Sequence, residues 1–128
     1  MLNTILNEEQ MNKVKSFLKK RTVILGIGNI LKGDDGVGIE IVNKLQGVKL
    51  PQNIKLIDAG VVPENYIASI NDFGPEIVLL IDAVYFDAPA GMTRLFEEKD
   101  LEFYGFSTHN MSPKLFIQAV KQREPYFQ

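Results

Sequence analysis

The chain has 128 residues, of which 45% are hydrophobic and 23% charged, and its formal net charge is −2. These values are typical of one soluble globular domain that buries a sizeable core. The chain has no cysteine, which excludes disulfides, thiolate metal sites and a cysteine nucleophile. No basic run exceeds Lys19-Lys20-Arg21, so no nucleic-acid partner is expected. No apolar run is long enough for membrane insertion and no signal-peptide pattern is present, which favours a cytoplasmic location.

The first half of the chain predicts a helix, a strand, a second helix and a second strand. Asn7 and Gln10 form a capping box before an apolar stripe, which indicates the first helix. Residues 22–27 are an apolar run bounded by glycine, as in a buried strand, and residues 54–58 form a shorter run. The apolar residues that define the two helices are Met11, Val14, Phe17 and Leu18 in the first and Val37, Ile41, Val42 and Leu45 in the second.

The second half continues the alternation. Pro63 and Gly74 bound a third helix, and residues 77–81 are the most apolar strand, predicted to be central and covered on both faces. Residues 92–96 are a candidate fourth strand, and Pro113 begins a last helix. The residues expected to face inward are Tyr66, Ile67, Ile70 and Phe73 in the third helix and Leu115, Phe116, Ala119 and Val120 in the last.

This alternation predicts an α/β fold. We expect a three-layer sandwich in which helices cover both faces of a mostly parallel twisted sheet, with a strand order beginning 2-1-3.

The loop GIGNILKGDDGVG, residues 26–38, begins like a nucleotide-binding turn and then becomes acidic. Its first two glycines match the dinucleotide fingerprint, but Leu31 occupies the third glycine position. Asp34 and Asp35 would lie near a helix N-terminus, where they would repel a phosphate and attract a cation. One aspartate of the pair could cap the helix, but a cap does not require two.

Two further residues are candidates for the same site. Asp82 ends the strand at 77–81, and ligands of open α/β sheets bind beyond the carboxyl ends of strands where the strand order reverses. The only histidine, His109, precedes the last helix. Two carboxylates and one imidazole suit a borderline divalent cation with coordination positions left open. Asp82 could equally be a solvated strand end, and a lone histidine is more often structural.

Several separate motifs then coincide. The loop at 26–38, Asp58-Ala59-Gly60, Ile81-Asp82-Ala83 and the sequence SerThrHisAsnMet at 107–111 lie in register between residues 22 and 122. Together they make the chain resemble the [NiFe]-hydrogenase maturation endopeptidases. The resemblance implies a cytoplasmic hydrolase that removes the C-terminal extension of a [NiFe]-hydrogenase large-subunit precursor after nickel insertion. The sequence ThrHisAsnMet around the histidine resembles the motif of the family branch that serves formate-hydrogenlyase-type and related membrane-bound hydrogenases.

The resemblance also assigns residues. It implies that the bound metal is nickel carried by the precursor and that zinc or cadmium can substitute for it. It also implies that the bound metal positions the scissile peptide. The catalytic and metal-binding positions implied by the family are Asp35, Asp82 and His109. The substrate-binding positions implied are Asn29, Asp58, Gly60 and Thr108.

The domain expectation is a single peptidase domain over residues 1–128, with an additional N-terminal helix in residues 1–21. Family members usually continue beyond the last helix with a further strand and helix, which have no counterpart after Arg123. We therefore expect an open sheet edge that is covered by the N-terminal helix, by residues 124–128, or by a second copy of the chain in a homo-oligomer.

Two other interpretations stay open. A receiver-like phosphoacceptor module has this length, an acidic pair after its first strand and an aspartate ending its third, but here the pair comes late and the lysine of a fifth strand is not found. A serine hydrolase would use Ser107 and His109, but the G-x-S-x-G elbow is absent. The H-E-x-x-H signature of zinc proteases is absent as well.

Overall fold

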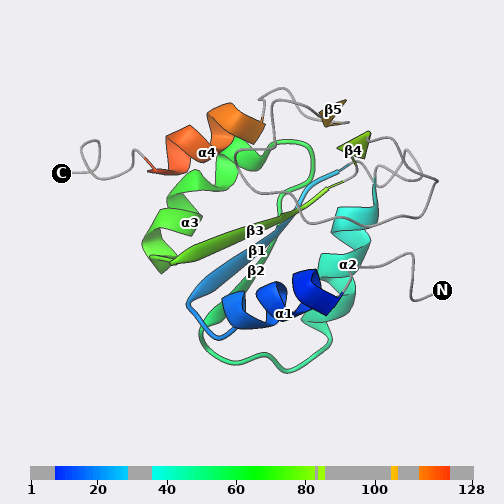
Figure 1. Ribbon diagram of the computed structural model, residues 1–128. Coiled ribbons are helices and arrows are strands. Elements are labelled where there is room, and N and C mark those ends of the chain that lie inside the picture. Colours follow the sequence, from blue (N-terminus) through cyan, green and yellow to red (C-terminus); the bar gives the residue numbers. More distant parts are fainter. Residues whose placement is uncertain (1–7, 29–35, 83, 86–104, 107–112, 122–128) are drawn as a thin grey trace.

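The computed structural model describes residues 8–28, 36–82, 84–85, 105–106 and 113–121 (Figure 1). The candidate strand at 92–96 and the candidate site residues Asn29, Asp34, Asp35, Thr108 and His109 lie outside these ranges. The elements are α1 (Glu8–Phe17), β1 (Thr22–Gly26), α2 (Val37–Gln46), β2 (Ile54–Asp58), the 3₁₀ helix η3 (Pro63–Tyr66), α3 (Ile67–Phe73), β3 (Ile77–Ile81), β4 (Val84–Tyr85), β5 (Gly105–Phe106) and α4 (Pro113–Lys121).

The central sheet has three parallel strands in the order β2-β1-β3, which confirms the predicted order. The register places Leu25 of β1 between Ile57 of β2 and Leu80 of β3. Every residue of β1 is buried, whereas all five residues of β3 are only half-buried. The prediction that β3 is central was wrong for the described sheet, because the two crossovers place β2 and β3 on opposite sides of β1. The antiparallel pair β4-β5 was not anticipated.

Helices cover both faces of this sheet, as the sequence predicted (Figure 1). Successive side chains of a strand point to opposite faces, so each strand supplies one set of residues to each layer. On one face the core is built from strand residues and from α3 and α4. Its buried members are Val23, Leu25, Ile27, Ile57, Ala59, Ile70, Phe116 and Val120.

The other face of the sheet is covered by α2, and the helix contacts the sheet most closely at two glycines. A Cβ atom on Gly38 would clash with the carbonyl oxygens of Ile81 and Ile27, and a Cβ on Gly26 would lie 2.7 Å from Cγ2 of Val42. The two glycines therefore let the backbone of α2 approach β1 and β3 more closely than any side chain would permit. Gly26 and Gly38 open and close the glycine-rich loop that the sequence analysis singled out.

This close approach also decides which side of α2 faces the sheet. The buried residues of α2 are Gly38, Ile39 and Val42, whereas Val37 and Ile41 are exposed. The helix itself was predicted correctly, but of the four apolar residues that defined it only Val42 is fully buried. The reason is that glycine contributes nothing to a hydrophobic pattern and yet marks the surface that packs most tightly.

The third helical segment agrees with its sequence signals. Pro63 occupies its first turn, which is 3₁₀ rather than α, and Gly74 ends it in the left-handed conformation at φ 67°. Ile70 is fully buried, and Tyr66, Ile67 and Phe73 pack against the same core. This segment therefore lies where the sequence placed it.

Polar contacts hold the amino ends of the strands. The hydroxyl of Thr22, which is completely buried, donates to the carbonyl oxygens of Phe17 (2.8 Å), the last residue of α1, and of Lys20 (3.1 Å). Asn53 Nδ2 donates to the carbonyl of Lys20 at 2.7 Å. Arg21 Nε donates to the carbonyl of Phe73 at 2.7 Å, and the guanidinium carbon lies 3.8 Å from the ring centroid of Phe73.

In the described part of the chain, no helix is long and apolar enough to cross a membrane.

Candidate functional site

The candidate site lies at the carboxyl edge of the sheet, where the three strands end side by side. Hydrogen bonds continue past the strands: Ile27 N donates to the carbonyl of Ile81 at 2.9 Å, and Ala59 N donates to the carbonyl of Gly26 at 2.8 Å. Gly28 N then donates to the carbonyl of Gly60 at 2.8 Å. Ile27 and Gly28, which follow β1, are thus held between the segments that follow β2 and β3, which places Asp82 and the Asp58 turn on either side of them.

Asp82 follows β3 directly and is half-buried. The preceding residue, Ile81, accepts a hydrogen bond from Ile27 and lies against Gly38 of α2. Asp82 is therefore fixed in the chain at the meeting point of β1, β3 and the first turn of α2. This agrees with its predicted place beyond a strand end at a reversal of strand order.

Asp58 and Gly60 form a tight turn at the end of β2. The carboxylate Oδ1 of Asp58 accepts a hydrogen bond from Gly60 N at 3.1 Å, as in an Asx turn. Gly60 has φ 56°, a conformation that glycine adopts without steric cost. These contacts give both residues a structural role in shaping the edge, and their role in substrate binding stays a prediction.

The acidic pair precedes α2 but does not cap it at the N-cap position. Gly36 occupies that position, and no side-chain hydrogen bond caps the helix there. The interpretation of an aspartate as the N-cap residue was therefore wrong. Asp34 and Asp35 immediately precede Gly36 in the sequence and lie outside the described residues.

The other two predicted metal ligands, Asp35 and His109, lie outside the described residues. Within residues 8–28, 36–82 and the shorter described segments, no group of three histidine, aspartate or glutamate side chains gathers that could hold a metal ion. The chemistry of the predicted donor set still suits a borderline cation, since it combines two carboxylates with one imidazole.

Glu64 is a residue near this edge that the sequence analysis did not single out. It lies in η3, four residues beyond Gly60, and its Oε1 atom is buried with no hydrogen-bond partner within the described part of the chain. A buried acceptor without a partner is costly, which makes Glu64 unusual among the carboxylates of the described residues. In the sequence it resembles an ordinary acidic residue in a first helical turn, so no signal distinguished it.

Comparison with known proteins identifies the family. The profile named HycI: Hydrogenase maturation protease matches residues 39–126, which is more than half of the chain. The chain belongs to the hydrogenase maturation protease family. It is 33% identical to a putative hydrogenase maturation protease of Methanocaldococcus jannaschii over 91% of this chain and 72% of that protein. It is also 33% identical to the hydrogenase 3 maturation protease of Escherichia coli K12, over 78% of this chain and 64% of that protein.

Solved structures of hydrogenase maturation proteases share the fold. The crystal structure of a [NiFe] hydrogenase maturation protease HycI from Thermococcus kodakarensis KOD1 matches with a TM-score of 0.68 at 28% identity, covering 84% of this chain and 70% of that one. A crystal structure of the hydrogenase 3 maturation protease matches with a TM-score of 0.61 at 28% identity, covering 82% of this chain and 67% of that one. Membership of this endopeptidase family confirms the resemblance seen in the sequence and decides against a receiver module.

Proposed function

We propose that this hydrogenase maturation protease removes the C-terminal extension of a [NiFe]-hydrogenase large-subunit precursor after nickel insertion, in the cytoplasm. The single structural observation that supports this proposal is the hydrogen-bonded carboxyl edge, which sets Asp82 beside the residues that directly follow β1 and beside the first turn of α2. In the proposal, Asp82, Asp35 and His109 contact the nickel that the precursor carries. Zinc or cadmium can replace that nickel as a probe of the same ligands.

The proposed chemistry uses the metal of the substrate to position the peptide. Two carboxylates and an imidazole that hold one ion fix the neighbouring scissile bond relative to the enzyme, which removes much of the entropic cost of the reaction. A water molecule is then activated either by the metal or by one of the carboxylates acting as a general base. Asn29, Asp58, Gly60 and Thr108 contact the substrate around this centre.

The decisive experiment compares nickel-loaded and nickel-free precursors. The purified protein is incubated with each form, and release of the C-terminal extension is followed by mass spectrometry. We expect cleavage of the nickel-loaded precursor only, because the proposed ligands need the ion to position the peptide. Equal cleavage of both forms would contradict the role of nickel, and cleavage of neither would contradict the proposed activity.

Variants test the residues in the same assay. Asp82→Asn keeps the shape of the side chain but removes the charge, and we expect a loss of about 10²-fold or more in cleavage rate. Asp72→Asn is a matched control, since Asp72 is exposed on α3. His109→Ala should lose far more activity than Ser107→Ala, because only the imidazole ligates a borderline metal well. Equal losses at these two positions would favour the serine-hydrolase alternative.

A further inference from the structure

An exposed apolar stripe runs along the outer flank of α2. Its members, called the α2 stripe below, are Val37, Ile41, Leu45 and Val48. Val37, Ile41 and Val48 are 41%, 38% and 55% exposed, and Leu45 is half-buried. Among the described residues, the exposed large hydrophobic side chains are these three and Val61. Scattered exposed apolar residues are normal, but here three of the four exposed large hydrophobic residues lie on one helical segment and form a continuous apolar surface.

The spacing of the stripe makes it continuous. Its residues are separated by four, four and three positions, which places them on one side of a helix. The chain keeps turning beyond Gln46, because Gly47 N donates to the carbonyl of Lys44 at 3.2 Å and Val48 N to that of Leu45 at 3.0 Å. The flanking side chains are exposed and polar: Glu40, Asn43 and Lys44. An apolar strip with a polar rim is the usual anatomy of a protein interface.

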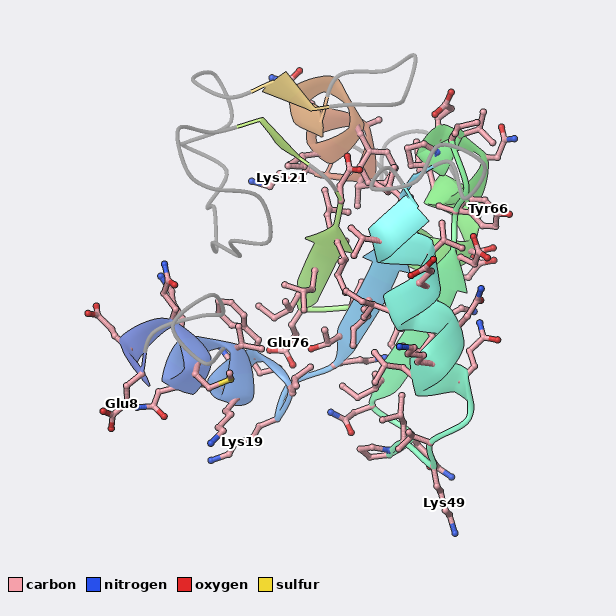
Figure 2. All side chains as sticks on the ribbon, turned by 90° about the vertical axis from the view of Figure 1, so that its right-hand side faces the viewer. Glu8, Lys19, Lys49, Tyr66, Glu76 and Lys121 are labelled. Carbon is pink, nitrogen blue, oxygen red and sulfur yellow. The ribbon has the colours of Figure 1, made fainter. Side chains whose placement is uncertain are left out.

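The stripe starts at the candidate site. Val37 precedes Gly38, which lies against the carbonyl oxygens of Ile27 and Ile81, and Ile81 is the neighbour of Asp82. From there α2 leads away from the carboxyl edge towards the segment that contains Lys49, and the helix faces the viewer in Figure 2. Tight packing through glycine turns Ile39 and Val42 inwards and leaves the stripe outside.

We infer that the α2 stripe is the docking surface for the apolar part of the precursor protein next to its cleavage site. The inference rests on the proposed function, since it names the surface that binds the same substrate. A protease that acts on a protein must hold more than the scissile peptide, because a specific complex buries on the order of 1,000 Å² or more. The stripe is apolar, adjoins the catalytic edge and extends from it over the length of one helix, so the precursor covers both together.

The test places a lysine on the stripe. Ile41→Lys and Val48→Lys each put a charge into the interface, and Asn43→Lys adds the same charge to the polar flank of the same helix. For cleavage of nickel-loaded precursor, we expect KM to rise about tenfold or more for the two stripe variants, with kcat within about twofold of the parent. Asn43→Lys should leave both constants unchanged. Val48→Lys is the sharper variant, because Val48 lies at the far end of the stripe from Asp82.

Binding is measured separately from cleavage, by biolayer interferometry with immobilised precursor, and folding is checked by circular dichroism. Weaker binding by folded Ile41→Lys and Val48→Lys, but not by Asn43→Lys, supports the inference. Unchanged KM and binding in both stripe variants would overturn it while leaving the proposed cleavage intact. A parent protein that binds the precursor through the stripe without cleaving it would instead overturn the proposed function alone. Light scattering that shows a dimer broken by the stripe variants, with precursor binding unchanged, would assign the stripe to a second copy and overturn the inference.

Discussion

The two faces of the sheet are packed by different means. On one face, large side chains from β1, α3 and α4 fill the space, with Phe116, Leu25 and Ile70 completely or almost completely buried. On the other face, α2 approaches the sheet through Gly26 and Gly38, where a Cβ atom would collide with backbone. One face therefore depends on the volume of its side chains, whereas the other also depends on the absence of a side chain at Gly26 and Gly38.

This difference shows how one sheet serves packing and function at once. The glycine contact holds the start of α2 directly against the carboxyl ends of β1 and β3, beside Asp82. It also leaves the flank of α2 exposed, whereas α3 and α4 use their apolar residues in the core. Among the described residues of the helices, the exposed large apolar side chains therefore lie on the glycine-packed side.

The largest effect is expected on the face packed by large side chains. Phe116→Ala should lower the free energy of unfolding by about 4 kcal/mol, because it removes a buried ring and leaves a cavity. Urea denaturation with linear extrapolation measures the change. Gln118→Ala, at an exposed position of the same helix, should stay within about 0.5 kcal/mol of the parent. A loss below about 1 kcal/mol for Phe116→Ala would mean that this face does not depend on volume.

On the glycine-packed face, the expected damage comes from adding an atom. Gly38→Ala should lower the free energy of unfolding by about 2–3 kcal/mol, because the new methyl group meets backbone carbonyls that cannot move aside. Gly47→Ala is the matched control: its Cβ would lie 3.6 Å from the nearest atom, and its φ of −82° suits alanine. The same denaturation experiment applies. If both variants were equally stable, the close approach of α2 would not be needed.

A smaller effect tests the polar anchor at the amino edge. Thr22→Val keeps the shape of the side chain but removes the hydroxyl that donates to the carbonyls of Phe17 and Lys20. We expect a loss of about 1 kcal/mol, since the hydrogen bonds of a fully buried hydroxyl are removed, although both carbonyls keep another donor. Ser16→Ala removes an exposed hydroxyl that donates to Lys13 and should change stability by less than about 0.5 kcal/mol. Thermal unfolding that ranks these two variants in reverse would contradict the anchoring role.

The smallest expected effect is the interaction free energy between substitutions on the two faces of the sheet. Ile70→Val should cost about 1 kcal/mol on its own face. In the double variant Ile70→Val/Thr22→Val, the two losses in free energy of unfolding should add to within about 0.5 kcal/mol. The reason is that the two side chains share no partner across the sheet. A double-mutant cycle with a larger interaction would show that the two layers are one coupled unit.

Local sequence signals determined the elements of this protein. Hydrophobic runs located β1, β2 and β3, and Pro63 and Gly74 marked the third helical segment, because these patterns reflect the geometry of one stretch of chain. The position of Asp82 at a strand end was likewise evident, and the order β2-β1-β3 followed from the alternation of strands and helices. The motif Asp58-Ala59-Gly60 marked the position of the turn that the hydrogen-bonded residues Asp58 and Gly60 form, whereas the buried Oε1 of Glu64 had no such signal.

Only the tertiary structure decided how these elements face one another. The hydrophobic pattern that located α2 includes Val37 and Ile41, but contact through Gly38 leaves both exposed and turns Ile39 and Val42 to the sheet. A similar limit applied to β3, whose apolar sequence indicated a central strand although it borders the described sheet. The hydrophobicity of a residue reflects the free energy gained when it is buried. The rotation of a helix about its axis and the place of a strand in the sheet depend instead on which backbone segments can come close, and this is decided only when the two elements pack together.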